Sequence, residues 1–282
     1  VLERAGAASA DMLIAVTFHD EVNMIACQVA HSVFKVPTKI ARIRAQSYLQ
    51  PGFQDLFSQD HLPIDVIISP ELEVGKAVLR RLAVPGAFDI LNFADGKVSV
   101  VGVSLEEDCP IVNTPLRQLT DLFPDLKSRV VGIVRNGELF VPQSDDPMLV
   151  GDEAYFAADV RDVRRTLGIF GHEETAARRI IIVGAGNIGL HVAQELETSH
   201  PGTRVKLIER DREKAVQAAE KLKRSMGLHG YGLDTERLQE AGIAETETLV
   251  TLTNNDQANI LSCVVAKREG CQRTMALINN NT

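Results

Sequence analysis

Residues 179–189 read RIIIVGAGNIG, an apolar, β-branched run followed by three closely spaced glycines. The run Arg179–Val183 is typical of a central parallel strand that is buried on both faces. Gly184 permits a tight turn, Gly186 removes the Cβ that would block a pyrophosphate, and Gly189 lets the next helix pack on the strand. The stretch therefore predicts a strand, a turn and a helix whose free N–H groups face a phosphate.

A carboxylate stands at the end of the next expected strand. The apolar run Arg204–Ile208 leads into Glu209, 25 residues after Gly184. A carboxylate at this place can accept hydrogen bonds from both hydroxyls of an adenosine ribose, and it repels a 2′-phosphate. Arg210 and Arg212 leave that discrimination open. We expect an adenine nucleotide or dinucleotide here, with NAD favoured over NADP; the alternative is a glycine turn without a ligand.

Further residues are expected at the carboxyl edge of the same sheet, where doubly wound sheets bind ligands. A short third strand is expected around Leu228–Gly232, and Tyr231 either stacks on the base or is a surface aromatic. Thr253 and Asn254 end a fourth strand. Asp256 and Asn259 are expected to cap and brace the following helix rather than to contact a ligand.

Part of this unit occurs twice in the chain. Residues 2–30 match residues 238–266 at a constant offset of 236, with 11 identities in 29 positions. Polar side chains are conserved between the copies: Thr17 and Thr253, Asp20 and Asp256, Asn23 and Asn259. Each copy reads as a strand, a polar corner, a helix and a second strand, which predicts parallel βαβ units with right-handed crossovers. We infer a duplication.

The middle of the chain has a different pattern. Residues 63–167 are expected to form a small α+β module with a helix over 71–83. Asp95-Gly96 and Asn136-Gly137 each predict the turn of a β-hairpin. Residues 168–177 are expected to form a polar linker. Neither a catalytic residue nor a metal site emerges here, because the acidic pairs lie beside turns and His61 is the only histidine, at the edge of the region.

Composition narrows the possible functions. With 282 residues, 45% of them apolar, the chain can build real cores, so disorder and fibrous structure are excluded. A net charge of −8 argues against nucleic-acid binding. Neither a membrane span nor a secretory signal is evident. The cysteines lack metal or disulfide spacing and are interpreted as small buried apolar residues: Cys27, Cys109, Cys263 and Cys271.

Taken together, these motifs resemble the RCK domains, which regulate potassium conductance. The resemblance rests on VGAGNIG (183–189), Glu209, HGYGLDTERLQEAGI (229–243) and TLTNNDQANILSCVVAK (251–267). It implies Rossmann-like, doubly wound parallel sheets, one partial and one nearly complete, with a small α+β module between them. The expected limits are the second half of a first RCK Rossmann domain (1–62), the module (63–167), the linker (168–177) and a second Rossmann domain (178–282).

The two-copy arrangement is similar to the regulatory subunits of bacterial Trk potassium uptake systems. The resemblance implies binding of NAD(H) or ATP/ADP, with Gly184, Gly186, Asn187, Ile188 and Gly189 at the phosphates, Glu209 and Arg210 near the ribose, and Gly230, Tyr231, Thr253 and Asn254 along the rest of the cleft. It also implies a ring, a tetramer of two-RCK subunits. The ring would lie in the cytoplasm beneath a Trk-type membrane potassium transporter, peripheral to the inner face of the plasma membrane.

Two further expectations follow. The glycine motif of the first copy and the strands around it would lie upstream of Val1, so the chain is interpreted as part of a longer protein. An NAD-dependent dehydrogenase is the alternative function. The duplicated Rossmann unit and the lack of a convincing catalytic acid or base disfavour it.

Overall fold

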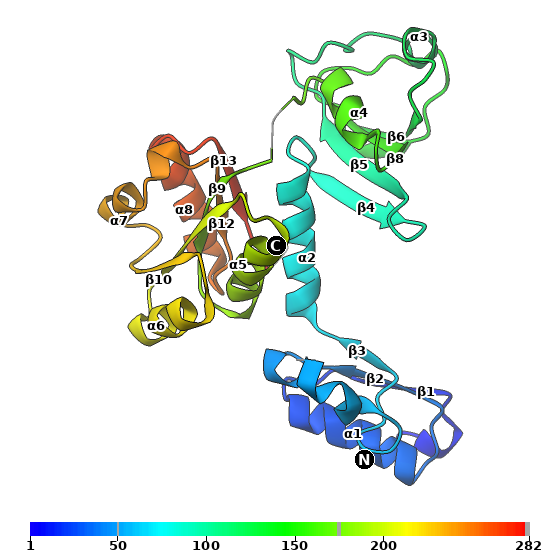
Figure 1. Cartoon of the computed structure of the whole chain (residues 1–282). Coiled ribbons are helices and arrows are strands. Elements are labelled where there is room, and N and C mark those ends of the chain that lie inside the picture. Colours follow the sequence, from blue (N-terminus) through cyan, green and yellow to red (C-terminus); the bar gives the residue numbers. More distant parts are fainter. Residues whose placement is uncertain (50, 174–175, 280–282) are drawn as a thin grey trace.

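The computed structural model describes residues 1–49, 51–173 and 176–279, whose strands form three separate sheets (Figure 1). Residues 174–175 of the predicted linker lie outside the described residues, as do residues 280–282 of the predicted second Rossmann domain. Among the helices described, none is both long and apolar enough to cross a bilayer.

The first sheet is parallel and is built by the first copy of the repeat. Its strand order is β1-β2-β3, and β1 and β2 are joined by the helix α1. Short 3₁₀ helices precede β1 and follow β2. The elements are η1 (Ala7–Ser9), β1 (Met12–Ala15), α1 (Asp20–Ser32), β2 (Thr38–Arg42), η2 (Gln46–Leu49), η3 (Pro51–Phe57) and β3 (Val66–Ile68).

The second sheet is parallel, with the order β11-β10-β9-β12-β13. Its central strand β9 is buried on both faces, as predicted. The predicted third strand ends earlier than expected, at His229. The elements are β9 (Arg179–Val183), α5 (Asn187–Ser199), β10 (Arg204–Glu209), α6 (Arg212–Lys221), β11 (Met226–His229), α7 (Thr235–Glu240), η4 (Ile243–Glu245), β12 (Thr248–Thr251), α8 (Asp256–Arg268) and β13 (Arg273–Ala276). This order confirms the doubly wound, Rossmann-like fold.

The third sheet is antiparallel, with the order β4-β5-β8-β6-β7. Both predicted hairpins are confirmed. At the second, Asn136 and Gly137 have φ values of 54° and 81°, the left-handed geometry that a two-residue hairpin turn requires. The elements are β4 (Asp89–Phe93), β5 (Val98–Ser104), α3 (Leu116–Leu122), β6 (Ser128–Arg135), β7 (Glu138–Phe140), β8 (Glu153–Asp159) and α4 (Val163–Ile169).

The structure differs from the predicted limits of the module at both ends. Residues 63–83 lie outside it, because β3 pairs with β2 in the first sheet and the helix α2 (Pro70–Ala83) packs against α5. At the other end, Phe170 lies within the predicted linker 168–177. It is instead buried in the module core, where its ring stacks on Phe156 at a centroid distance of 5.3 Å.

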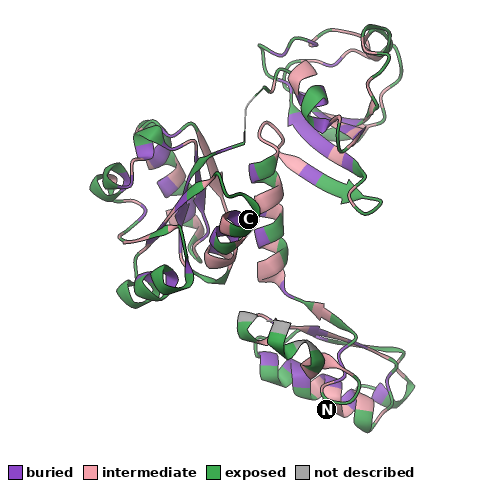
Figure 2. Ribbon diagram, viewed as in Figure 1, coloured by how far each residue is buried: buried purple, intermediate pink, exposed green. Residues whose placement is uncertain are grey.

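The helix α2 thus runs from the first sheet to the module and lies beside α5 of the second sheet (Figure 1). Val78 and Leu82 on one side of α2 join the apolar core of the second sheet, and Figure 2 shows the buried residues gathered along the strands and the facing helices. Gly75 allows the close approach of α5, since a Cβ added there would lie 2.6 Å from His191 Cδ2. The packing couples both Rossmann-like units to one helix.

The cysteines are free thiols. Three are buried, as predicted, and Cys263 is half-buried. Burial raises the pKa of each thiol, and that of Cys27 reaches about 11. At neutral pH these side chains are therefore protonated and behave as small apolar groups.

Candidate nucleotide-binding site

The glycine loop joins β9 to α5 at the carboxyl edge of the second sheet. Gly184 has a φ of 107°, and a Cβ there would lie 3.1 Å from the backbone of Leu252. A Cβ on Gly189 would lie 1.9 Å from Gly184 O, so Gly189 lies beneath the loop and permits its packing. Gly186 is the N-cap of α5, and a Cβ added to it would meet no described atom within 4 Å. The loop therefore faces open space at Gly186.

A cavity of about 240 Å³ adjoins the loop. It is lined by eight of the predicted binding residues: Gly184, Gly186, Glu209, Arg210, Gly230, Tyr231, Thr253 and Asn254. The structure thus brings together residues from the carboxyl ends of four strands, β9, β10, β11 and β12. Tyr231 is 43% exposed at the rim.

Glu209 holds the glycine loop and the following turn together. Its Oε2 accepts a hydrogen bond from Ala185 N at 2.7 Å, and its Oε1 accepts one from Asp211 N at 2.9 Å. Each carboxylate oxygen has further lone pairs, so ribose hydroxyls could share them. The carboxylate is thus fixed in orientation at the wall of the cavity.

Asn259 braces the corner that carries Thr253 and Asn254. Its Oδ1 accepts bonds from Thr253 N and Oγ1 at 3.1 and 2.6 Å, and its Nδ2 donates to Thr253 O and Leu277 O. The predicted bracing role of Asn259 is confirmed. The cap of α8 is Asn255 rather than the predicted Asp256, whose Oδ1 accepts from Asn279 N instead.

A second cavity, of about 490 Å³, lies on the outer side of the loop. Gly186, Asn187 and Ile188 line it, opposite two arginines of the first copy, Arg42 and Arg44. Arg44 Nε is 2.7 Å from Glu71 Oε1, at the start of α2. These two arginines were not among the predicted binding residues. Their position at the carboxyl end of a strand was the available signal.

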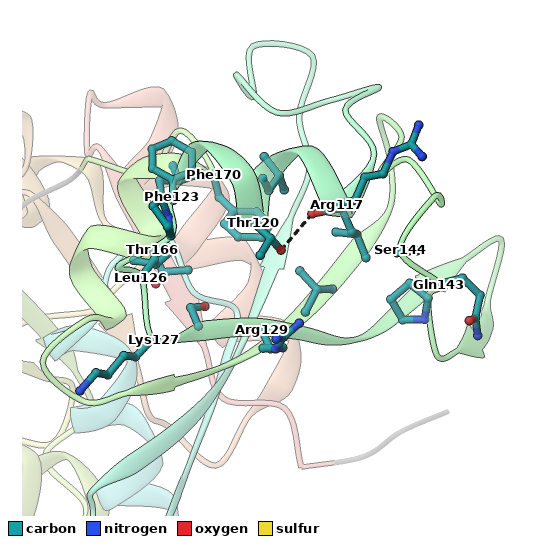
Figure 3. Close-up of a pocket in the computed structure, with 17 residues that line it drawn as sticks. Arg117, Thr120, Phe123, Leu126, Lys127, Arg129, Gln143, Ser144, Thr166 and Phe170 are labelled. Carbon is teal, nitrogen blue, oxygen red and sulfur yellow. Dashed lines mark hydrogen bonds between the residues drawn. The ribbon is translucent and has the colours of Figure 1, made fainter.

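The module contains a separate cavity of about 500 Å³ (Figure 3). Phe123 and Phe170 lie toward one end of it and Gln143 toward the other. Three cationic side chains are among its lining residues: Arg117, Lys127 and Arg129. Arg117 is paired with Asp145 at 2.9 Å. No motif in the sequence had indicated this cavity.

Comparison with known proteins agrees with this architecture. The TrkA-N domain family matches residues 1–70 and 180–282, and the TrkA-C domain family matches residues 100–171. The chain belongs to the TrkA family. Within this family, the Trk system potassium uptake protein TrkA of Azorhizobium caulinodans is 58% identical over 279 residues, covering 99% of this chain and 61% of that protein. The corresponding protein of Halomonas elongata is 42% identical over 280 residues, covering 99% and 60%.

The chain therefore spans about 60% of the length of these curated TrkA relatives. Solved RCK structures share its fold. The RCK domain of GsuK aligns with a TM-score of 0.59 at 17% identity, covering 96% of this chain and 60% of that one. The GsuK channel bound to NAD aligns with a TM-score of 0.58 at 17% identity, covering 95% and 50%. The resemblance to RCK domains is thus confirmed.

Proposed function

We propose that this TrkA-family chain binds NAD(H) or ATP/ADP at the glycine loop and so regulates a Trk-type membrane potassium transporter. One observation carries the proposal: the glycine loop of the second copy and Arg42 and Arg44 of the first copy line the same cavity. A nucleotide whose phosphates entered this cavity would contact both Rossmann-like units. Its differential affinity for two arrangements of these units is what could change a transporter's state.

The two cavities suit different parts of a nucleotide. In the proposed assignment, Glu209 receives the ribose, Gly186 the phosphates and Gly230 the base side of the cleft. Lys214 and Lys221 add positive charge to the phosphate side, together with the two arginines. Cationic side chains and helix N–H groups favour phosphate oxygens. Asn187, Ile188, Arg210, Tyr231, Thr253 and Asn254 remain proposed contacts, while Gly189 would act through the packing of the loop.

Exposed apolar residues support assembly into a ring. Val22 and Ile25 lie three residues apart on α1, and Phe18 and Val33 flank its two ends; each is at least half exposed. The repeat-related α8 exposes Ile260, Leu261 and Val264. Apolar patches of this kind are typical of interfaces between protein chains. We propose a ring of the tetrameric type, cytoplasmic and peripheral to the inner face of the plasma membrane, with the transporter as partner.

Ligand-induced thermal stabilisation tests the nucleotide proposal. NADH, ATP and ADP should each be titrated against the chain and against Gly186→Val, whose side chain would enter open space without a clash in the free protein. Loss of the shift in the variant is the expected result, and an unchanged shift would contradict the site. NADH absorbance followed with candidate substrates distinguishes a regulator from a dehydrogenase, because only the latter consumes the cofactor.

A further inference from the structure

A third cavity lies at the opposite edge of the second sheet from the glycine loop. It has a volume of about 250 Å³ and is enclosed by the end of α2, the loop 85–87 and the first residues of β12 and β13. The glycine loop follows the carboxyl end of β9, whereas Thr248 and Arg273 begin their strands. This cavity is therefore separate from the proposed nucleotide site.

Its lining is positively charged. Arg81 from α2, Lys267 from α8 and Arg273 from β13 line it, and its lining residues include no acidic side chain among the residues described. In a chain of net charge −8, such a concentration of cations is unexpected. Three separate elements contribute one cation each, so the cluster depends on the tertiary fold.

Arg81 and Lys267 retain capacity to bind an anion. Arg81 is exposed and makes no hydrogen bond or ion pair within the described part of the chain. Lys267 Nζ donates one hydrogen bond, to Gln272 O, and an ammonium group has three donors.

A threonine also lines the cavity. Thr248 begins β12 and is only 3% exposed, and its hydroxyl can donate a hydrogen bond to an oxygen of a ligand in the cavity. The first copy has Met12 at the equivalent position, so the hydroxyl belongs to the second copy alone.

Helix-dipole compensation does not account for this cluster. Arg81 and Lys267 lie in the last turns of their helices, where cations offset the negative helix end. Arg268 serves that purpose equally well, yet it does not line the cavity and lies near Glu269. Dipole compensation also requires neither Arg273, which lies on a strand, nor a buried threonine.

We propose that this cavity binds a small phosphoanion of about the size of pyrophosphate. Arg81, Lys267 and Arg273 would hold its charge, and Thr248 would donate to one of its oxygens. Arg81 lies in the last turn of α2, and the loop 85–87 joins α2 to β4 of the module. A bound anion would therefore hold this connection against the second sheet. The proposal adds a second ligand site and does not rest on nucleotide binding.

Isothermal titration with sodium pyrophosphate tests it, in the Gly186→Val background so that the glycine loop does not contribute. Chloride at matched ionic strength controls for screening. Arg81→Gln should weaken binding about tenfold, the loss expected for one charge-assisted hydrogen bond. Thr248→Val should weaken it by a smaller factor. Arg268→Gln removes the same charge from a neighbouring helix end and should leave the dissociation constant within about twofold.

The outcomes separate clearly. Loss in Arg81→Gln with retention in Arg268→Gln, while both keep the circular dichroism of the parent, supports the site. Equal loss in both variants would mean general electrostatic attraction and would overturn it, as would an absence of pyrophosphate binding. Cosedimentation with phosphatidylglycerol vesicles, without any response to pyrophosphate in solution, would point to a lipid surface and would also overturn the proposal.

Discussion

Thr253 Oγ1 donates a hydrogen bond to Asn259 Oδ1 at 2.6 Å, and the first copy repeats this contact between Thr17 and Asn23 at 2.7 Å. In both copies the asparagine also accepts from the threonine N–H and donates to the threonine carbonyl. A strand-to-helix corner is thus fixed by one buried amide group. In the second copy that corner borders the nucleotide cavity.

Asn259→Ala should release this corner. The substitution leaves Thr253 N–H without its acceptor, and the loss of a buried hydrogen-bonded amide costs about 2 kcal/mol or more. Hydrogen exchange at the Thr253 amide should accelerate, while exchange at Thr17 stays unchanged. Asn23→Ala is the matched control and should show the reverse pattern. Acceleration at both sites in either variant would indicate global rather than local loosening.

Glu209→Gln should weaken nucleotide binding without unfolding the loop. The amide oxygen can still accept from Ala185 N, but the charge that favours ribose hydroxyls is lost. We expect the affinity for NADH and ATP to fall roughly tenfold, as for a hydrogen bond to a charged group. Glu213→Gln, an exposed site on α6, is the control. Titration calorimetry would contradict the assigned role of Glu209 if the two variants bound equally.

Glu197 should make the second Rossmann-like unit sensitive to acid. Burial opposes its ionisation, but hydrogen bonds from the backbone N–H groups of Lys223, Arg224 and Ser225 outweigh it and lower the pKa to about 2. A carboxyl group whose pKa is lowered on folding stabilises the folded state at any pH above its ordinary pKa of 4.5. This stabilisation is lost as the pH falls from 4.5 toward 2. Glu197→Gln should flatten the fall in melting temperature across this window. A variant as acid-sensitive as the parent would contradict this.

Asp152→Asn should destabilise the module strongly. Asp152 is 1% exposed and accepts two bonds from Arg135, at 2.8 and 2.7 Å, which lower the pKa of the carboxyl. Breaking a fully buried ion pair costs roughly 3–5 kcal/mol, but Arg135 is 30% exposed and water compensates part of its charge, so we expect a loss of about 2–3 kcal/mol. Asp159→Asn removes the solvent-exposed contact with Arg161 and should change thermal stability little. Similar losses in both variants would contradict the special role of burial.

The glycine loop was predictable because its constraints are local. Gly184 needs a left-handed backbone, and the glycine spacing follows from the turn itself. The Asn136-Gly137 hairpin was predictable for the same reason. Repeat comparison added the bracing roles, since buried polar side chains in register seldom match by chance.

Tertiary placement was not predictable in the same way. The segment 63–83 reads as a strand and an amphipathic helix, and either sheet could have accepted it. The position of this segment in the fold depends on the pairing of β3 with β2 and on the close packing of His191 against Gly75. Both contacts join residues that are distant in the sequence. Arg44 likewise reaches the glycine loop only because α2 links the two units. Local patterns carry no information on such contacts.

Gly75→Ala should loosen the contact between α2 and α5. The added methyl group would lie 2.6 Å from His191 Cδ2, so the imidazole or the helix must move. Because α5 begins at the glycine loop and α2 borders the same cavity, we expect both a lower melting temperature and weaker nucleotide binding. His191→Ala in the same chain should restore part of each loss, because it vacates the space. Additive losses in the double variant would contradict direct contact between the two positions.

The same contact should respond to pH. Burial lowers the pKa of His191, while Glu195 opposes the shift and Lys76 adds to it. A histidine whose pKa is lowered on folding favours the folded state while its imidazole is neutral. Its contribution to the free energy of unfolding is therefore present at pH values above its ordinary pKa of 6.5 and is lost as the pH falls below it. The melting temperature of the parent should therefore decline from about pH 7 toward pH 5. His191→Gln should show a smaller decline, and an identical decline would assign the effect to other groups.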